Sequence, residues 1–197
     1  MRNEKVKEMA IYSLFTAIIV ILASTPLGFI RVGVVSVTII PIFVIIMAFL
    51  LGVKGGLEGG VTFGIVSMIV AFTLGPTGLD ALFRNPLVSV LPRVIFGLVA
   101  GIIGDLLNKK YGNELGKKTV LMVIASVLLS LLHTALVLPM MYLFIPTVQE
   151  FEKFWDETPF LIYFWATLVS NGFIEMALTG AVVPVCSVPL KKVLERN

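Results

Sequence analysis

The stretch NPLVSVLPRVIFGLVAGIIGDLL, residues 85–107, decides the fold class. After Pro86 it is apolar over about the 20 residues that an α-helix needs to cross a bilayer. Asn85 before Pro86 is typical of a helix start, because asparagine caps free backbone N–H groups and proline fits the first helical position. The same stretch carries Arg93 directly after Pro92. That arginine needs an explanation, since a charge within the hydrocarbon is costly.

The composition indicates a membrane protein. The chain has 197 residues, of which 58% are hydrophobic and 14% charged. Soluble domains are about 45–50% apolar and about 25% charged. The single cysteine, Cys186, excludes an internal disulfide and a multi-cysteine metal site. It is predicted to be a small buried apolar residue.

Six apolar runs are long and uncharged enough to be membrane helices, at residues 9–25, 37–51, 56–74, 86–108, 119–143 and 159–183. We therefore predict an all-α integral membrane protein with six transmembrane helices in one domain, residues 1–197. Thr158 before Pro159 repeats the cap-and-proline start of the fourth run. The second run is short, so either the chain before it dips into the protein or the helix begins earlier.

The basic residues divide unevenly between the two ends of these spans. Eleven of the fifteen fall on one side: Arg2, Lys5, Lys7, Lys54, Lys109, Lys110, Lys117, Lys118, Lys191, Lys192 and Arg196. Arg31, Arg84 and Lys153 fall on the other side, with the acidic loop at residues 149–157. The positive-inside rule then places both termini in the cytoplasm. Topology and contacts with anionic lipids explain these charges, so no nucleic-acid partner is predicted.

Four polar side chains lie within the predicted spans: Arg93, His133, Asn171 and Glu175. At 1.5 Å per residue, Arg93 lies about 10 Å below the outer surface. Asn171 and Glu175 are four residues apart and share a helix face. All three helices thus carry polar groups in their outer half or middle. This pattern predicts a pocket that opens to the outside.

Each of these residues also has a structural interpretation. Arg93 and Glu175 could form a buried ion pair that joins two helices. His133 could be a hydrogen-bonded interior histidine, and Asn171 could bridge two helices. Asn85 is a helix cap first and a ligand contact only in addition. The sequence leaves these alternatives open.

Several function classes are excluded or weakened. One histidine and one distant cysteine do not supply paired metal ligands, so no metal, cofactor or enzymatic activity is predicted. The glycine-rich stretch at residues 51–64 lacks a preceding strand and a Gly-Lys-Ser/Thr ending, so it is not a phosphate-binding loop. No channel filter and no inverted repeat with broken helices is present. A protein with an external pocket and no energy source needs a partner.

Three motifs carry a resemblance to a known family. They are STPLGFI at residues 24–30, LGVKGGLEGGVTFG at residues 51–64, and NPLVSVLPRVIFGLVAGII at residues 85–103. Nearly the whole chain resembles the substrate-binding S components of energy-coupling-factor (ECF) vitamin transporters, in the branch of pantothenate and related vitamin binders. The resemblance implies six helices in the S-component fold, in the cell membrane of a prokaryote. It also implies docking onto a membrane scaffold subunit that carries two cytoplasmic ATPases.

The resemblance further implies which residues act. The loops at residues 29–36 and 75–85 would line or cover a vitamin that enters from outside. The substrate-binding candidates are Arg31, Thr38, Asn85, Arg93, His133, Asn171 and Glu175. The scaffold-facing candidates are Ala10, Ser13 and Ala17, which share one helix face of small residues. Their alternative interpretation is packing within the chain itself.

Arg93 then has an expected role. Pantothenate carries a carboxylate, and an arginine offers a planar fork of donors that matches it. Pro92 frees the backbone carbonyl of Val88, which we expect to accept a ligand hydroxyl. Pyridoxine, riboflavin or a thiamin-precursor pyrimidine are alternative cargoes, and pyridoxine or the pyrimidine would depend more on His133 and Asn171. A stand-alone small-solute permease is the alternative from another class.

Overall fold

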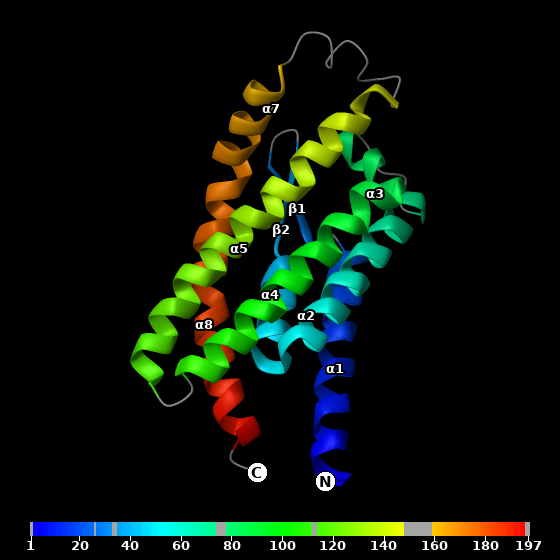
Figure 1. Ribbon diagram of the computed structural model, residues 1–197. Helices are drawn as coiled ribbons and strands as arrows, with labels where there is room; N and C mark the ends of the chain where they lie inside the picture. The colour runs from blue at the N-terminus through cyan, green and yellow to red at the C-terminus, as the bar shows by residue number, and fades with distance from the viewer. Residues whose placement is uncertain are drawn as a thin grey trace.

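The computed structural model describes residues 2–25, 27–32, 35–73, 78–111, 114–147 and 159–195. Its long helices are α1 (Arg2–Ala23), α2 (Ile40–Thr73), α4 (Leu91–Tyr111), α5 (Leu115–Phe144), α7 (Phe160–Thr167) and α8 (Phe173–Glu195). Shorter elements are α3 (Pro86–Ser89), the 3-10 helices η1 (Gly78–Arg84) and η2 (Ile145–Thr147), and the antiparallel strands β1 (Phe29–Val32) and β2 (Val35–Thr38). The elements form one helical bundle, with the hairpin β1–β2 inserted between α1 and α2 (Figure 1).

Helix α2 turns back on itself at Gly52. This residue has φ 67° and ψ −150°, a conformation that only glycine adopts readily. A Cβ on Gly59 would lie 3.5 Å from the Cα of Val44, which requires the arms on either side of Gly52 to run antiparallel. The arms correspond to the segments predicted at residues 37–51 and 56–74. The first arm begins at Ile40, because residues 37 and 38 belong to β2, and the second begins directly after Gly52.

Two side chains of α4 hold this turn. The carboxylate of Asp105 accepts a hydrogen bond from the backbone N–H of Val53 at 3.2 Å, so it caps the start of the second arm. The amide of Asn108 donates to the carbonyl of Phe49 at 2.9 Å and satisfies the end of the first arm. A Cβ on Gly52 would collide with Asp105. One helical turn of α4 therefore caps both arms.

Glycines let the second arm of α2 approach α4 closely. A Cβ on Gly56 would collide with the carbonyl of Gly97, and a Cβ on Gly60 with the carbonyl of Arg93. Gly64 faces the backbone of Val90. We call the close contact of Gly56, Gly60 and Gly64 with α4 the glycine seam. In lipid such small-residue contacts stabilise helix pairs by close packing.

The fourth predicted helix, residues 86–108, is broken. Asn85 caps α3 through a 2.9 Å bond from the backbone N–H of Leu87, which confirms the predicted cap. The chain then leaves the helix at Val90 and α4 starts at Leu91. The break follows from Pro92, which has no N–H to donate to the carbonyl of Val88.

The sixth predicted helix also differs. Pro159 is the residue before α7 rather than its first residue, and α7 has no side-chain cap. A π-helical turn, Leu168–Gly172, separates α7 from α8, and α8 continues to Glu195 rather than ending at residue 183. The predicted cap Thr158 and the acidic loop at residues 149–157 lie outside the described residues.

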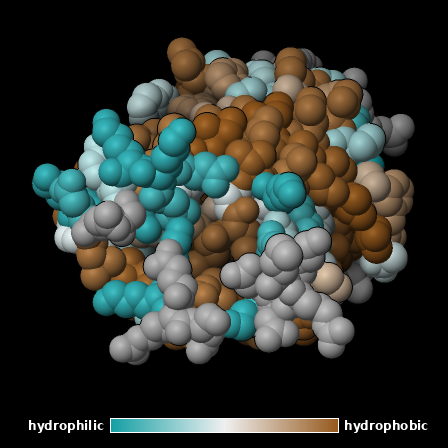
Figure 2. Space-filling model, turned by 60° about the horizontal axis from the view of Figure 1, so that its bottom comes forward, coloured by the Kyte–Doolittle hydropathy of each residue, from teal (hydrophilic) through white to brown (hydrophobic). Residues whose placement is uncertain are grey.

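Five described helical stretches are long and apolar enough to cross a bilayer: Val6–Ala23, Ile40–Thr73, Pro86–Tyr111, Leu115–Phe144 and Phe160–Leu194. The start of α1 and the end of α8 lie at the same end of the bundle, opposite α3 (Figure 1). Polar residues gather around that end, whereas apolar residues cover the flank beyond it (Figure 2). This distribution is typical of a protein surrounded by lipid.

Candidate ligand-binding site

Arg93 projects from the first turn of α4 into the bundle and is only 2% exposed. Its Nη1 donates to the carbonyl of Val88 at 2.5 Å. Its guanidinium carbon lies 5.1 Å from the ring centre of Phe63 and 4.5 Å from that of Phe83. Two cation–π contacts and one hydrogen bond thus hold the charge in place. The Val88 carbonyl, which we expect to accept a ligand hydroxyl, accepts this bond from Arg93 and keeps a second lone pair.

His133 lies beside this arginine. It is 4% exposed on α5, and its ring stacks on Phe63 at 5.8 Å and tilts against Phe96 at 5.1 Å between ring centres. Phe63 therefore contacts both Arg93 and His133. Nε2 of His133 and Nε of Arg93 are buried and have no hydrogen-bond partner among the described residues. Buried polar atoms in native proteins are nearly always paired, so these two atoms indicate a place for a further group.

Glu175 on α8 is 8% exposed and faces the hairpin. Its Oε1 accepts a hydrogen bond from the backbone N–H of Thr38 at 2.7 Å. Both Arg93 and Glu175 are described, and no nitrogen of Arg93 lies within 4.0 Å of a Glu175 oxygen. The structural alternative of a direct ion pair between them is therefore not formed.

Asn171 is buried in the π-helical turn Leu168–Gly172, one turn before Glu175. Such turns widen a helix locally and are frequent at functional sites. They also change which residues face inward, and here both Asn171 and Glu175 are buried. The hairpin, the π-helical turn and the start of α8 thus meet at one wall.

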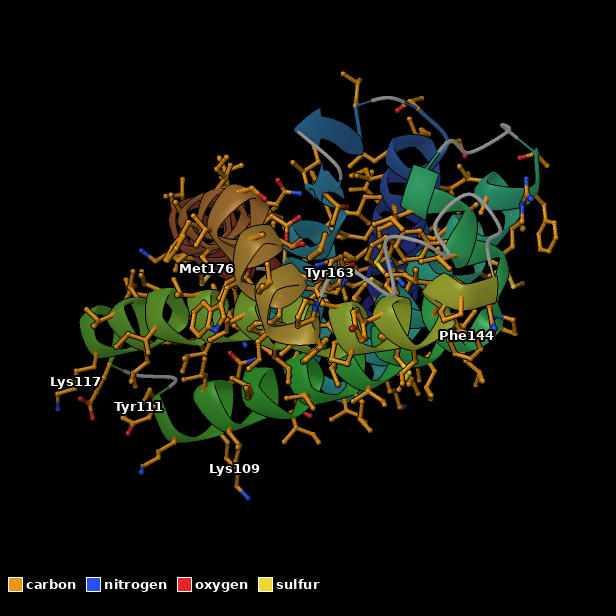
Figure 3. All side chains as sticks on the ribbon, turned by 90° about the horizontal axis from the view of Figure 1, so that it is seen from above. Lys109, Tyr111, Lys117, Phe144, Tyr163 and Met176 are labelled. Atoms are coloured by element: carbon orange, nitrogen blue, oxygen red, sulfur yellow. The ribbon has the colours of Figure 1, made fainter. Side chains whose placement is uncertain are left out.

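An aromatic cluster closes the bundle on the α7 side. Tyr142 contacts the rings of Phe160 and Tyr163 at 5.1 and 5.7 Å between centres. The hydroxyl of Tyr163 lies 3.9 Å from the sulfur of Met141. Tyr163 lies where α7 meets α5, far from the group formed by Lys109, Tyr111 and Lys117 at the edge of the molecule (Figure 3). This aromatic cluster therefore lies away from the group of Lys109, Tyr111 and Lys117.

The remaining candidates are placed as follows. Asn85 is half-buried and its Oδ1 is engaged in the cap of α3. Thr38 is half-buried, and its Oγ1 accepts from the backbone N–H of Ile40 at 3.4 Å. Arg31 lies on β1, where its backbone pairs with Ser36, but its side chain is outside what the structure describes.

The three scaffold-facing candidates Ala10, Ser13 and Ala17 are all exposed on α1. The buried residues of α1 instead join the core formed largely by α2; they are Phe15, Ile19 and Ala23. The small-residue face is thus not used for packing within the described chain.

Sequence reasoning missed the aromatic residues that surround Arg93 and His133, namely Phe63, Phe83 and Phe96. A local signal exists for two of them. Phe63 directly precedes Gly64 of the glycine seam, and Phe96 follows Arg93 by three residues on the same face of α4. Nothing local marks Phe83, which comes from η1.

The arrangement around Arg93 can bind an anion. No group of three His, Cys, Asp or Glu side chains converges as a metal site within the described ranges. The buried guanidinium keeps Nε unused, and its surroundings are apolar and aromatic. A guanidinium in such surroundings binds carboxylates strongly, because little water competes for it.

The fold and site define a class: a multi-pass helical membrane protein with a buried cationic site. A family model described as "ECF transporter, substrate-specific component" matches residues 7–187. The chain belongs to this family of ECF substrate-specific components. It is also 37% identical over 120 residues to the pantothenate transporter PanT of Leuconostoc mesenteroides subsp. mesenteroides. That match covers 57% of this chain and 58% of the relative's length.

Proposed function

We propose that this chain is the high-affinity pantothenate-binding subunit of an ATP-driven ECF importer in a prokaryotic cell membrane. The observation that carries the proposal is Arg93, a buried guanidinium with an unused Nε in an aromatic enclosure. Of pantothenate, pyridoxine, riboflavin and a thiamin-precursor pyrimidine, only pantothenate has the carboxylate that such a group binds. The similarity to the pantothenate transporter PanT supports the same cargo.

The rest of the site suits the other end of pantothenate, which carries an amide and hydroxyls. His133, Asn171 and Glu175 are buried polar side chains from α5, the π-helical turn and α8. Thr38 reaches the same wall through its bond to Glu175. We assign Arg93 to the carboxylate and this wall to the polar remainder. Arg31 and Asn85 belong to the outer rim in this arrangement.

The proposed topology has six spans, because the two arms of α2 count separately after the turn at Gly52. Both termini are cytoplasmic, which agrees with the common end of α1 and α8 (Figure 1). Lys109, Lys110 and Lys117 lie at that side and fit the positive-inside rule. The candidate site then opens outward.

The subunit hydrolyses nothing itself in this proposal. It docks on a membrane scaffold subunit with two ATPases, and the exposed face of Ala10, Ser13 and Ala17 on α1 is the proposed contact. Small residues allow another helix to approach closely in lipid. The chain tilts in the membrane during the cycle and releases the vitamin inside.

Mass spectrometry can identify the cargo without a candidate compound being chosen in advance. The full chain is extracted in mild detergent, and the small molecules released on denaturation are identified. Pantothenate is expected among the released molecules. If pyridoxine, riboflavin or a thiamin-precursor pyrimidine is found instead, that compound is the cargo. Co-purification of a scaffold subunit and two ATPases is expected too. Transport by the chain alone in liposomes would instead establish a stand-alone permease.

A further inference from the structure

Ser67 is a buried serine whose hydroxyl forms no hydrogen bond within the described chain. It lies on the second arm of α2, is 4% exposed, and its Oγ has no partner. Helical serines and threonines usually donate to the carbonyl four residues earlier. Among the described residues six others do so: Thr73, Ser89, Thr119, Ser126, Thr134 and Thr179. Ser67 therefore lacks the hydrogen bond to the preceding turn that these other helical serines and threonines make.

The glycine seam places Ser67 at the level of the Arg93 guanidinium. Gly60 meets the backbone of Arg93 and Gly64 meets that of Val90, so α2 and α4 run antiparallel there. The side chain of Arg93 extends back along α4 to the carbonyl of Val88. Its guanidinium therefore lies beside the part of α2 between Gly64 and Ser67.

Phe63 fixes the face on which Ser67 lies. It precedes Ser67 by four residues, so the two side chains share one face of the arm. That face points to the site, because the ring of Phe63 contacts both Arg93 and His133. Three buried atoms without a partner then belong to one region: Oγ of Ser67, Nε of Arg93 and Nε2 of His133.

We propose that Ser67 is a ligand-contact residue whose hydroxyl donates a hydrogen bond to the anionic group held by Arg93. This inference rests on the proposed function, and it names a second residue that binds the ligand carboxylate together with Arg93. A carboxylate has two oxygens, so it can accept from Nε of Arg93 and from Oγ of Ser67 together. The apolar walls of Phe63 and Phe83 favour such a charge-assisted bond, because they keep water away. An uncharged cargo group would gain much less from Ser67.

Ser187 supplies a matched control. It is fully buried, and its Oγ also has no partner among the described residues. It lies on α8 twelve residues beyond Glu175, which is about 18 Å along the helix toward the basic end. Ser187→Ala therefore makes the same chemical change away from the site.

The test is calorimetric titration of pantothenate into the purified full chain, with thermal unfolding of the ligand-free protein. Ser67→Ala should weaken binding by about tenfold or more, the effect of losing a hydrogen bond to a charged group. The Tm of ligand-free Ser67→Ala should equal or exceed that of the wild type, since the lost hydroxyl had no partner. Ser187→Ala should keep the wild-type affinity. Ser67→Cys, with its weaker donor, should fall between wild type and Ser67→Ala.

The outcomes separate the two proposals. Wild-type affinity in Ser67→Ala overturns the Ser67 assignment alone. A fall in affinity together with a fall in Tm also overturns it, because packing then explains the loss. A wild-type chain that binds no pantothenate overturns the proposed function, and the role of Ser67 with it.

Discussion

The backbone N–H of Thr38 donates to the carboxylate of Glu175 across 2.7 Å, although 137 residues separate them in sequence. Thr38 ends β2 and Glu175 lies in the first turn of α8, so this bond ties the hairpin to the helix that follows the π-helical turn. Glu175 is thereby oriented toward the hairpin and forms no ion pair with Arg93 within 4.0 Å. Its proposed role is to hold the wall of the site beside the vitamin.

The variants Glu175→Gln and Glu175→Leu show whether binding depends on the hydrogen bond from Thr38 to residue 175 or on the charge of Glu175. Glutamine keeps a carbonyl oxygen that can accept from Thr38, whereas leucine leaves that buried N–H without a partner. We expect Glu175→Gln to bind pantothenate within a few-fold of wild type, and Glu175→Leu to lose about tenfold or more. Titration calorimetry on both variants measures this. Equal losses in the two variants would show that the charge of Glu175 matters rather than its bond to the hairpin.

The glycine seam should tolerate no added methyl group. A Cβ on Gly97 would collide with the carbonyl of Gly56 and lie 3.1 Å from the Cα of Gly60. Gly97→Ala should therefore destabilise the chain by about 1–3 kcal/mol, the usual cost of overpacking. Gly116→Ala is the control, because a Cβ there meets nothing within 4 Å. Thermal unfolding in detergent should show a lower Tm for the first variant only, and equal values would refute the close contact.

The exposed face of α1 should be needed for docking and not for binding. Ala17→Trp adds bulk to an exposed position, so the isolated chain should bind pantothenate with nearly unchanged affinity. Uptake by cells that contain the scaffold and the ATPases should fall strongly. Leu128→Trp, at a 57% exposed position of α5, should leave uptake intact. Loss of binding in Ala17→Trp would place this face inside the chain's own packing.

Cysteine labelling tests the proposed orientation. In a Cys186→Ala background, a cysteine replaces Lys117 near the start of α5 or Pro146 just after its end; both positions are exposed. An impermeant thiol reagent added to intact cells should label the cysteine at position 146 and spare that at position 117. Labelling of position 117 alone would invert the topology and turn the site toward the cytoplasm.

Local patterns predicted the parts of the fold that local chemistry determines. Apolar runs located the membrane helices, and Asn85 with Pro86 located the start of α3, because a cap depends only on its neighbours. The turn at Gly52 depends on Asp105 and Asn108, which lie more than fifty residues further along the chain. The hairpin was not predicted either, since its strands stabilise each other and Thr38 depends on distant Glu175.

The candidate site also has a part that the sequence predicted and a part that it did not. The cost of burying a polar group singled out Arg93, His133, Asn171 and Glu175, and all four are buried. Their partners were not predictable, because Phe63 and Phe83 reach Arg93 from α2 and η1. The π-helical turn at Asn171 likewise has no recognised local signal in the sequence.

The most direct test of the central claim compares pantothenate with the analogue in which a primary alcohol replaces its carboxylate. Both are titrated into the wild type and into Arg93→Gln, Arg93→Lys and Arg93→Gln with Glu175→Gln. The wild type should prefer pantothenate by about ten- to a hundred-fold, since charge-assisted hydrogen bonds contribute about 1.5–3 kcal/mol. Arg93→Gln should abolish the preference, and Arg93→Lys should recover only part of it because it lacks the planar fork. The double variant should not restore it. Equal binding of both compounds by the wild type, or a preference that survives Arg93→Gln, would contradict the assignment of Arg93 to the carboxylate.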